Sequence, residues 1–197
     1  MIQFIKNSFG HLKNIFIHKY WVFHYCRKFG ITWRGIVHDL SKFNPIEFLE
    51  SVKYYRGTES PIPVCKKANG VSKAWQHHKG RNPHHYEYWT DNYDGGNPTY
   101  HPIPYKYVME MLADWFAAGK TYAIRQGKDF KISDEFVWWE EKKKSNPAIN
   151  KRTIEFIDMF MKDAMFFSPD MSWVKDEHNQ KVLKNRLNDL YAKDLNK

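Results

Sequence analysis

The chain has 197 residues, of which 42% are hydrophobic and 17% aromatic, and its 31 Lys and Arg residues outnumber 22 Asp and Glu residues, a net charge of +9. This length is typical of one compact domain, and so much apolar area excludes a disordered chain, because burial offsets the entropy lost on ordering. No apolar run approaches the roughly 20 residues that cross a bilayer, and residues 1–9 lack the apolar core of a signal peptide. Without such a run we expect no membrane partner. Two cysteines exclude a disulfide framework and a four-thiolate zinc site, so we expect a protein of the reducing cytoplasm.

Basic residues and histidines are concentrated in the first half of the chain. Residues 1–100 carry 14 Lys and Arg against 7 Asp and Glu, whereas residues 101–197 carry 17 against 15. Eight of the 10 histidines also lie in residues 1–100. A positive, histidine-rich half is typical of a metal centre that receives an anionic substrate, but also of a nucleic-acid surface or an ordinary solvated face.

The pattern of apolar residues predicts an all-α fold without strands. Apolar residues recur at helical spacing along residues 2–29, and a glycine then ends that helix. Asparagine followed by proline predicts two further helix starts, at Asn44 and Asn82. Turn-forming Pro and Gly residues predict loops over residues 57–70 and 91–104. The helices expected in chain order cover residues 2–29, 33–42, 44–56, 72–79, 82–89, 105–126, 133–144, 153–167 and 173–195.

Several common enzyme classes lack their motifs in this chain. It contains neither the H-E-x-x-H motif of zinc proteases nor the G-x-S-x-G motif of serine hydrolases. Residues 118–121, Ala-Gly-Lys-Thr, imitate the end of a phosphate-binding loop, but Asp114 stands where such a loop needs its first glycine. What remains is a spaced set of His and Asp residues.

The adjacent residues His38 and Asp39 are the first candidate metal ligands. Imidazole suits borderline metals such as zinc, and carboxylate suits harder ones. Neighbouring side chains of a helix point about 100° apart, but at the end of a helix both can approach one ion. Lys42, four residues after His38, lies on the same helical face, where it could meet an anionic substrate.

Further histidines precede and follow this pair. His18 lies on an apolar row of the first expected helix, and it faces inward if that row is buried. The pairs His77-His78 and His84-His85 stand seven residues apart. Either member of each pair could be a ligand, and its neighbour a supporting or surface residue.

Asp114 is the most informative carboxylate. It lies in an expected helix that is apolar on nearly all faces. A buried carboxylate without a partner is costly, so a metal ion or a buried Lys or Arg is needed to compensate its charge. The sequence leaves both alternatives open.

The order of these residues resembles that of the HD-domain superfamily of metal-dependent phosphohydrolases. A histidine, a His-Asp pair, further histidines and a final Asp follow one another on successive expected helices. Residues 38–43, His-Asp-Leu-Ser-Lys-Phe, resemble the HD-x-x-K core of that superfamily, and residues 113–115, Ala-Asp-Trp, resemble the helix that bears its last ligand. Together with HHKGRNPHHYEYW and DWFAAGK, this stretch also looks like a small uncharacterised family of phages and Gram-positive bacteria. The resemblance covers residues 11–126.

This resemblance implies an HD-domain-like helical bundle with additional C-terminal helices. Residues 1–126 would form the metal-binding helical core. Residues 127–197, which match nothing in the superfamily, would form a helical extension packed on that core. The core would hold one or two divalent ions, drawn from Mn, Fe, Zn, Co, Ni and Mg, in a bacterium or a phage-infected host.

The resemblance also implies roles for individual residues. Asp39 and Lys42 are the catalytic candidates, and Lys42, Lys79 and Arg81 are candidates for contacts with a substrate phosphate. In each of the pairs His77-His78 and His84-His85, either histidine could be the ligand, and His78 and His84 are preferred. The metal ligands expected are His18, His38, Asp39, His78, His84 and Asp114.

Three functions follow as hypotheses. The first is a metal-dependent phosphohydrolase that acts on a nucleotide or another small phosphoester by metal-activated water. The second is a di-iron oxygenase that uses the same ligands, and the third is a non-catalytic protein that binds a nucleotide or another partner. The expected partner is a small anionic substrate, with a nucleotide preferred; nucleic acid is less favoured, and the oligomeric state stays open.

Other residues in the histidine-rich half have a structural explanation. His11 and His24 are expected as hydrogen-bonded core residues, and His178 as a surface residue. A group of aromatic residues could stack on a nucleobase, although their helical spacing favours positions in the core. These residues are Trp75, Tyr86, Tyr88 and Trp89.

Overall fold

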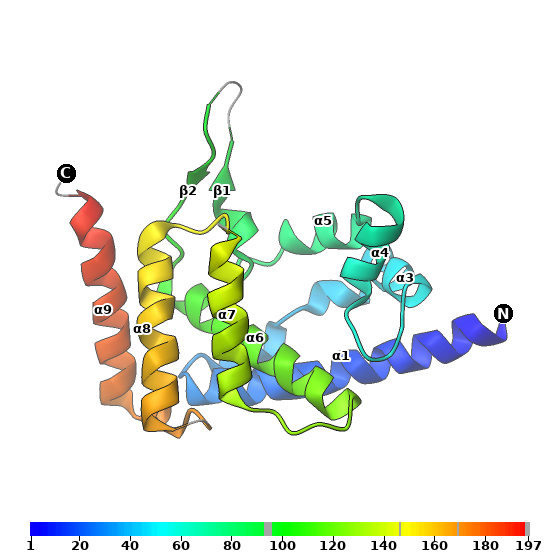
Figure 1. The fold of residues 1–197 in the computed structure, drawn as a ribbon, viewed down its shortest axis with the longest axis horizontal. Helices are drawn as coiled ribbons and strands as arrows, with labels where there is room; N and C mark the ends of the chain where they lie inside the picture. Colours follow the sequence, from blue (N-terminus) through cyan, green and yellow to red (C-terminus); the bar gives the residue numbers. More distant parts are fainter. Residues whose placement is uncertain (93–95, 146, 169, 196–197) are drawn as a thin grey trace.

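In a computed structural model, the protein is all-α over the residues that the structure describes, 1–92, 96–145, 147–168 and 170–195. Helices α7, α8 and α9 stand side by side at one end, and the long helix α1 runs along the lower side of the view with α6 packed against it (Figure 1). None of the described helices is long and apolar enough to span a membrane. The α-helices are α1 (Ile2–Lys28), α2 (Thr32–Val37), α3 (Pro45–Lys53), α4 (Pro61–Asn69), α5 (Lys73–Lys79), α6 (Tyr105–Arg125), α7 (Ile132–Lys144), α8 (Lys151–Phe167) and α9 (Glu177–Leu195). Short 3-10 helices are η1 (Leu40–Phe43), η2 (Tyr86–Trp89) and η3 (Ser172–Lys175).

A short hairpin interrupts the helices, so the expectation of no strands was wrong. Strand β1 (Thr90–Asp91) pairs antiparallel with β2 (Thr99–Tyr100). Each strand has two residues, which is too short for an alternating pattern to show in the sequence. The hairpin projects away from the helices (Figure 1).

The expected loop over residues 57–70 contains helix α4, so that prediction was also wrong. Ser60 caps the helix by accepting a hydrogen bond from a backbone N–H, and Pro61 occupies its first position. The same combination of cap and proline correctly predicts α3, where Asn44 is the cap. Gly70, with φ of 76°, ends α4 in a conformation that suits glycine.

The helix expected over residues 33–42 is broken in the middle. Helix α2 ends at Val37 because His38 leaves the helical region, with ψ of 130°, and Asp39 is left-handed, with φ of 53°. The chain then continues as η1. The helix expected over residues 82–89 is likewise only a turn followed by η2. Both breaks lie at candidate ligands, whose conformation depends on contacts with distant segments.

Helix α2 is held against α1 by a close approach at Gly35. A Cβ atom at this position would lie 2.9 Å from the Cα of Phe23 and 2.8 Å from the Cβ of Cys26. Only glycine leaves room for the two backbones at this distance. The contact therefore holds α2 close to α1, and with it the junction between α2 and η1. Two candidate ligands, His38 and Asp39, lie at this junction.

The hydrophobic core runs without interruption from α1 and α6 into the C-terminal helices. The ring of Phe160 in α8 lies 5.7 Å from that of Phe29 and 6.3 Å from that of Phe116. Trp139 of α7 is fully buried and stacks on Trp115 of α6 at 5.4 Å. The helices after residue 126 thus pack directly on the earlier ones, and all contribute to one apolar cluster.

We predict that Phe160→Ala lowers the free energy of unfolding by about 3–5 kcal/mol, because it leaves a cavity between α8, α6 and α1. Urea unfolding, followed by circular dichroism, measures the change. Phe166→Ala is the control, since Phe166 lies in the same helix but is 83% exposed. Equal stability of the two variants would contradict a shared core.

A second prediction concerns Glu135, whose buried side chain packs beside Gly119. Burial and the nearby Asp134 raise the pKa of Glu135 from 4.5 to about 7. The folded state therefore holds this proton more tightly than the unfolded state, so stability is full below about pH 4.5 and falls as pH rises toward 7. The shift corresponds to on the order of 3 kcal/mol above pH 7. Glu135→Gln should remove this loss.

Unfolding at pH 5 and pH 8 tests the prediction. We expect Glu135→Gln to stabilise the protein at the higher pH and to change little at the lower one. Glu141→Gln, on the exposed face of the same helix, should have little effect at either pH. The same gain for Glu135→Gln at both values would exclude a titration of this carboxyl as its cause.

Candidate metal centre

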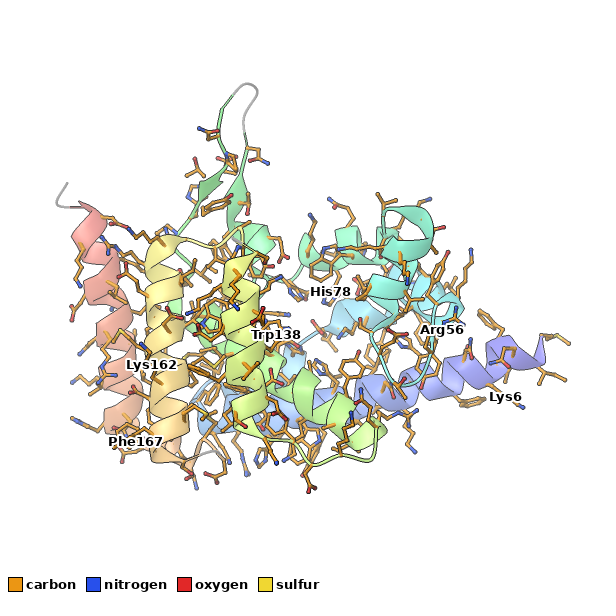
Figure 2. All side chains as sticks on the ribbon, viewed as in Figure 1. Lys6, Arg56, His78, Trp138, Lys162 and Phe167 are labelled. Carbon is orange, nitrogen blue, oxygen red and sulfur yellow. The ribbon has the colours of Figure 1, made fainter. Side chains whose placement is uncertain are left out.

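Five segments that are distant in sequence bring histidines and carboxylates together in the interior. His18 comes from α1, Asp114 from α6, and His38 and Asp39 from the junction between α2 and η1. His78 comes from the end of α5, and its position near the middle of the molecule is visible in Figure 2. His84 and His85 come from the turn before η2.

Asp39 lies at the centre of this group and has an unusual backbone. Its φ of 53° is left-handed, a conformation that costs a residue with a Cβ atom about 1–2 kcal/mol. In a continuous helix its side chain would point about 100° away from that of His38. The break instead brings His38 Nε2 to 3.1 Å from Asp39 Oδ2. The local strain therefore allows two adjacent residues to reach one point, as is common at functional sites.

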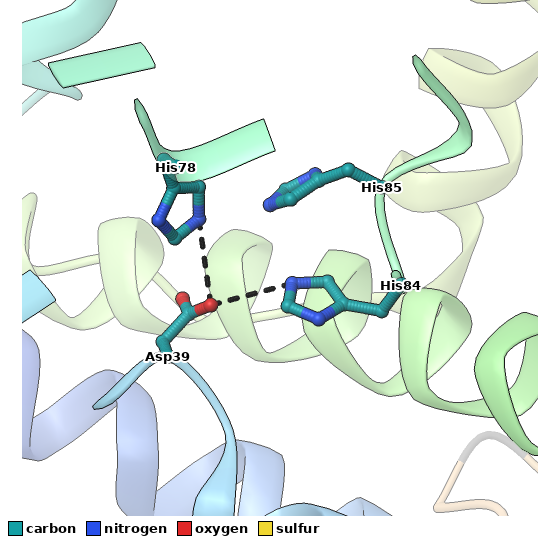
Figure 3. Close-up of side chains that lie close together, drawn as sticks. All are labelled: Asp39, His78, His84 and His85. Atoms are coloured by element: carbon teal, nitrogen blue, oxygen red, sulfur yellow. Dashed lines mark ion pairs between the residues drawn. The ribbon is translucent and has the colours of Figure 1, made fainter. Parts of the chain in front are cut away.

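The two oxygens of Asp39 face different histidines. Oδ1 lies 3.4 Å from His78 Nε2 and 3.3 Å from His84 Nε2, with His85 beside them (Figure 3). Oδ2 faces His38 and, at 4.0 Å, His18 Nε2. Asp39 thus lies between two sets of imidazoles.

Asp114 closes the group on the side of α6. Its Oδ1 lies 2.9 Å from His18 Nε2 and 3.5 Å from His38 Nε2, and its Oδ2 lies 3.9 Å from His84 Nε2. The sequence left open whether a metal or a buried cation compensates this carboxylate. In the structure its nearest described partners are ring nitrogens.

Two groups of potential ligands share Asp39. In each group, one ligand atom per residue lies within 4.8 Å of all the others. The first group consists of His18, His38, Asp39 and Asp114, and the second of Asp39, His78, His84 and His85. A mixture of imidazole and carboxylate donors suits Zn, Fe, Mn, Co or Ni. The arrangement can hold a metal ion in either group, with Asp39 available to both.

Unsatisfied polar atoms support this interpretation. Nε2 of His18, His38 and His84 and both oxygens of Asp39 are buried, and none makes a hydrogen bond of good geometry within the described residues. A buried polar atom left without such a partner costs about 1–3 kcal/mol, and more if it is charged. Several such atoms face one point, and a metal ion bound there would give all of them a partner.

Two further carboxylates hold the opposite sides of the histidine rings. Glu110 Oε1 lies 3.1 Å from His38 Nδ1 and 3.4 Å from His84 Nδ1, and Arg34 donates to its other oxygen at 2.6 Å. Glu47 Oε2 lies 2.7 Å from His78 Nδ1. A carboxylate that accepts from Nδ1–H leaves Nε2 free to coordinate, which is the usual support for a histidine ligand.

Charges within the site favour the ionised, metal-binding forms of the two carboxylates, but not the neutral forms of His38 and His84. Burial lowers the pKa of these two rings, but the neighbouring carboxylates outweigh it and raise that pKa, so metal binding there would release a proton. Burial raises the pKa of Asp39, but His38 and Lys42 outweigh it and hold that pKa well below the ordinary value. The pKa of Asp114 is also well below its ordinary value: burial raises it, but the adjacent rings of His18 and His38 outweigh burial. Burial keeps the pKa of His85 well below its ordinary value. Ionised carboxylates and neutral imidazole are the ligating states.

A cavity of about 240 Å³ opens onto the cluster. The start of α4 covers it at Ser60, Pro61 and Ile62, and α6 contributes Tyr122. Lys42 is the single Lys or Arg among the described residues that line it, and its Nζ lies 2.6 Å from Asp39 Oδ2. The cavity thus combines the ligand cluster with one cation.

The structure brings together all six expected metal ligands and Lys42, but not the two other basic candidates. Lys79 and Arg81 do not line the cavity within the described part of the chain, and Arg81 is exposed. Of the first histidine pair, His78 faces Asp39 whereas His77 pairs with Glu47. Both members of the second pair face the cluster.

Sequence reasoning missed three residues of the site. His85 was placed second to His84, although it belongs to the second ligand group. Glu110 precedes Asp114 by one helical turn in the same apolar helix, a signal that could have identified it. Glu47 had no signal, because its partners come from α5.

The remaining candidates divide between the cavity and the core. His11 lines the cavity, and burial and Lys42 lower its pKa to about 4. Trp75 also lines the cavity, within ring contact of His85. The others lie elsewhere: Tyr86 and Trp89 pack on the core, Tyr88 and His178 are exposed, and His24 is partly buried.

We predict that the purified protein, free of a histidine tag, binds about one or two divalent ions per chain. Mass spectrometry of the metal content should show loss of metal in Asp39→Ala, because both ligand groups use that residue. His78→Ala should lose the ion of the second ligand group, whereas its neighbour His77→Ala should retain the wild-type metal content. Folded wild-type protein that binds no metal after reconstitution would contradict the assignment.

Comparison with known proteins identifies a family without an assigned activity. The chain matches the model of a family described as "Family of unknown function (DUF5662)" over residues 7–163, which include both ligand groups. No match was found among curated proteins or among solved structures. The match spans more than half of the chain, and the protein therefore belongs to the DUF5662 family.

Proposed function

We propose that this protein is a metal-dependent phosphohydrolase that acts on a nucleotide or another small phosphoester. The observation that carries the proposal is the arrangement around Asp39. Two ligand groups share this carboxylate, and Lys42 stands beside it in the same cavity. A cation site next to a fixed positive side chain is suited to a substrate whose reacting group is an anion.

The ligand set would hold one or two divalent ions. When bound, such an ion would lower the pKa of a coordinated water, so that the water can attack phosphorus at neutral pH, and the ion would also neutralise charge on the phosphoryl oxygens. The residues of the chain have a different task, which is to hold the ligands in place. Glu110 and Glu47 orient the histidine rings, and Arg34 in turn fixes Glu110.

Lys42 is the residue that we assign to the phosphate. Burial lowers the pKa of Lys42, but Asp39 and Asp114 outweigh it and raise that pKa above the ordinary value. The ammonium group therefore stays charged at neutral pH. Its position in the cavity lets it contact a phosphoryl oxygen and stabilise the negative charge that grows there in the transition state.

The rest of the cavity suits the leaving group of the phosphoester, the part of the substrate that carries the phosphate. Apolar side chains such as Ile15, Ile62 and Trp75 line it together with polar groups such as Thr121 and Tyr122. Such a mixture excludes most water and offers hydrogen bonds at a few points. A volume of about 240 Å³ accommodates a small phosphoester better than a polymer.

The resemblance to HD-domain phosphohydrolases supports the same proposal. The residues that carry it, His18, His38, Asp39 and Asp114, form the first ligand group. Membership of the HD superfamily is itself part of the proposal, since the family of this chain has no assigned activity.

Hydrolysis assays with a panel of nucleoside monophosphates and p-nitrophenyl phosphate test the proposal. We expect activity that requires Mn, Co, Ni, Zn, Fe or Mg, is abolished by a chelator and is lost in Asp39→Ala. Lys42→Ala should lower kcat/KM by roughly 100-fold or more, because it removes a charge that stabilises the transition state. Lys79→Ala and Arg81→Ala serve as matched controls and should change kcat/KM little, because neither residue lines the cavity.

Three results would contradict the proposal. Turnover by Asp39→Ala at the wild-type rate would exclude the cluster as the active site. Iron as the sole bound metal, with turnover that consumes oxygen, would favour the di-iron oxygenase. Tight nucleotide binding by metal-loaded protein without any product would favour a binding protein.

A further inference from the structure

The outer surface of the first half of the chain exposes an unusual number of large apolar side chains. They belong to α1, α2, η1 and α3, and each is at least 42% exposed. We call this surface the basic apolar face. Its large apolar members are Ile2, Ile5, Phe9, Phe16, Tyr20, Trp33, Ile36, Leu40, Phe43, Ile46 and Leu49.

Helix α1 forms the central stripe of this face. Phe9 is 70% exposed, Phe16 59% and Tyr20 61%, and their spacing of seven and four residues places them on one side of the helix. Lys13 and Arg27 are exposed on the same side, at the same spacing. The opposite side of α1 carries the buried ligand His18. In Figure 1 the N-terminal end of α1 extends beyond the other helices.

The stripe continues onto neighbouring elements. The ring of Phe16 lies 6.1 Å from that of Phe43 in η1, and η1 leads directly into α3 with its exposed Ile46. Lys19 of α1 donates to the backbone carbonyls of Ile36 and His38, which ties α2 to the same surface. Phe16 and Phe43 are therefore in contact, and the other exposed apolar groups lie on α1 itself, on α2 and α3, which pack against α1, or on η1, which packs against α3.

The charge of this face has one sign. Helix α1 contains five Lys and Arg residues and no Asp or Glu. Only three acidic residues occur in residues 1–58, and each has partners: Asp39 in the buried cluster, the buried Glu47 with His78, and the partly buried Glu50 with Ser72 and the start of α5. Exposed cations on this part of the chain are Lys6, Lys13, Arg27, Lys53 and Arg56.

We propose that the basic apolar face binds the surface of an anionic lipid membrane. Apolar side chains can enter the region between headgroups and acyl chains, while Lys and Arg attract the phosphates of acidic lipids. This surface mode of binding needs no membrane-spanning helix. It departs from the absence of a membrane partner that the sequence predicts, since that prediction considered only spanning segments.

Charge and side-chain chemistry argue against two other partners. A second copy of the same face would bring two cationic surfaces together without an acidic group between them. A nucleic acid would match the charge, and aromatic rings could stack on its bases. The aliphatic members, such as Ile36, Leu40 and Leu49, have no stacking role but suit lipid.

Sedimentation with lipid vesicles tests the proposal on the full-length protein. Vesicles of phosphatidylcholine with about one third phosphatidylserine should bind the wild type, and vesicles of pure phosphatidylcholine should bind it much more weakly. Lys6→Glu/Lys13→Glu should weaken binding roughly tenfold or more, because each reversal removes an attraction and adds a repulsion. Phe9→Ser/Phe16→Ser should weaken it similarly at low salt and, unlike the charge variant, should still weaken it at high salt, where screening suppresses the charge contribution.

Matched variants on the C-terminal helices serve as controls. Lys181→Glu/Lys184→Glu changes the charge equally on exposed positions of α9, and Phe166→Ser removes an aromatic side chain that is 83% exposed on α8. Both should bind vesicles like the wild type. Circular dichroism and metal content verify that every variant is folded.

Several outcomes would overturn the proposal. One is a wild-type protein that does not sediment with acidic vesicles, and another is equal binding by the α1 variants and the controls. A preference for single-stranded DNA over acidic vesicles would assign the face to nucleic acid. Dimerisation in analytical ultracentrifugation that Phe9→Ser/Phe16→Ser abolishes would assign it to a second copy of the chain.

Discussion

The buried carboxylate of Asp39 is the constraint on which the arrangement of the first six helices depends. It is 1% exposed, has a strained backbone, and faces ring nitrogens from α1, α5 and the turn before η2. A buried charge of this kind is stable only if opposite charges surround it. Lys42 provides one such charge at 2.6 Å, and a bound cation would provide the rest.

Rigid elements around the cluster allow it to keep its geometry. Helix α6 supplies both Asp114 and, one turn earlier, Glu110, so a single helix carries a candidate ligand and a carboxylate that contacts the rings of two others. The C-terminal helices pack on the opposite side of α6 through Trp139 and Phe160. They contribute no residue to the ligand groups among the described residues, and their physical role is to bury the back of the helix that carries the site.

Helix α1 has two sides with different chemistry. Its inner side carries His11 and His18 to the cavity, whereas its outer side carries Phe9, Phe16 and exposed cations. The long helix can serve both because its middle and C-terminal parts are fixed against α2 and α6, while its outer stripe makes no contribution to the core. A catalytic cluster on one side and a lipid-binding surface on the other would place a small-molecule reaction next to a membrane. The two proposals are independent, since no residue is shared between them.

The sequence by itself determined the helical class and the approximate extent of the long helices, and it singled out His and Asp residues that the fold brings together, because periodicity and residue type are local properties. It also indicated that Asp114 needs a partner, since a carboxylate in an apolar helix implies one. Only the tertiary structure decided that His38 and Asp39 lie at a left-handed break rather than in a helix, and that α4 covers the cavity. It also selected His78 over His77 and brought both His84 and His85 to Asp39. The direction of each of these side chains follows from contacts between segments far apart in sequence, such as Glu47 with α5 and Glu110 with the α2–η1 junction, and no local pattern contains them.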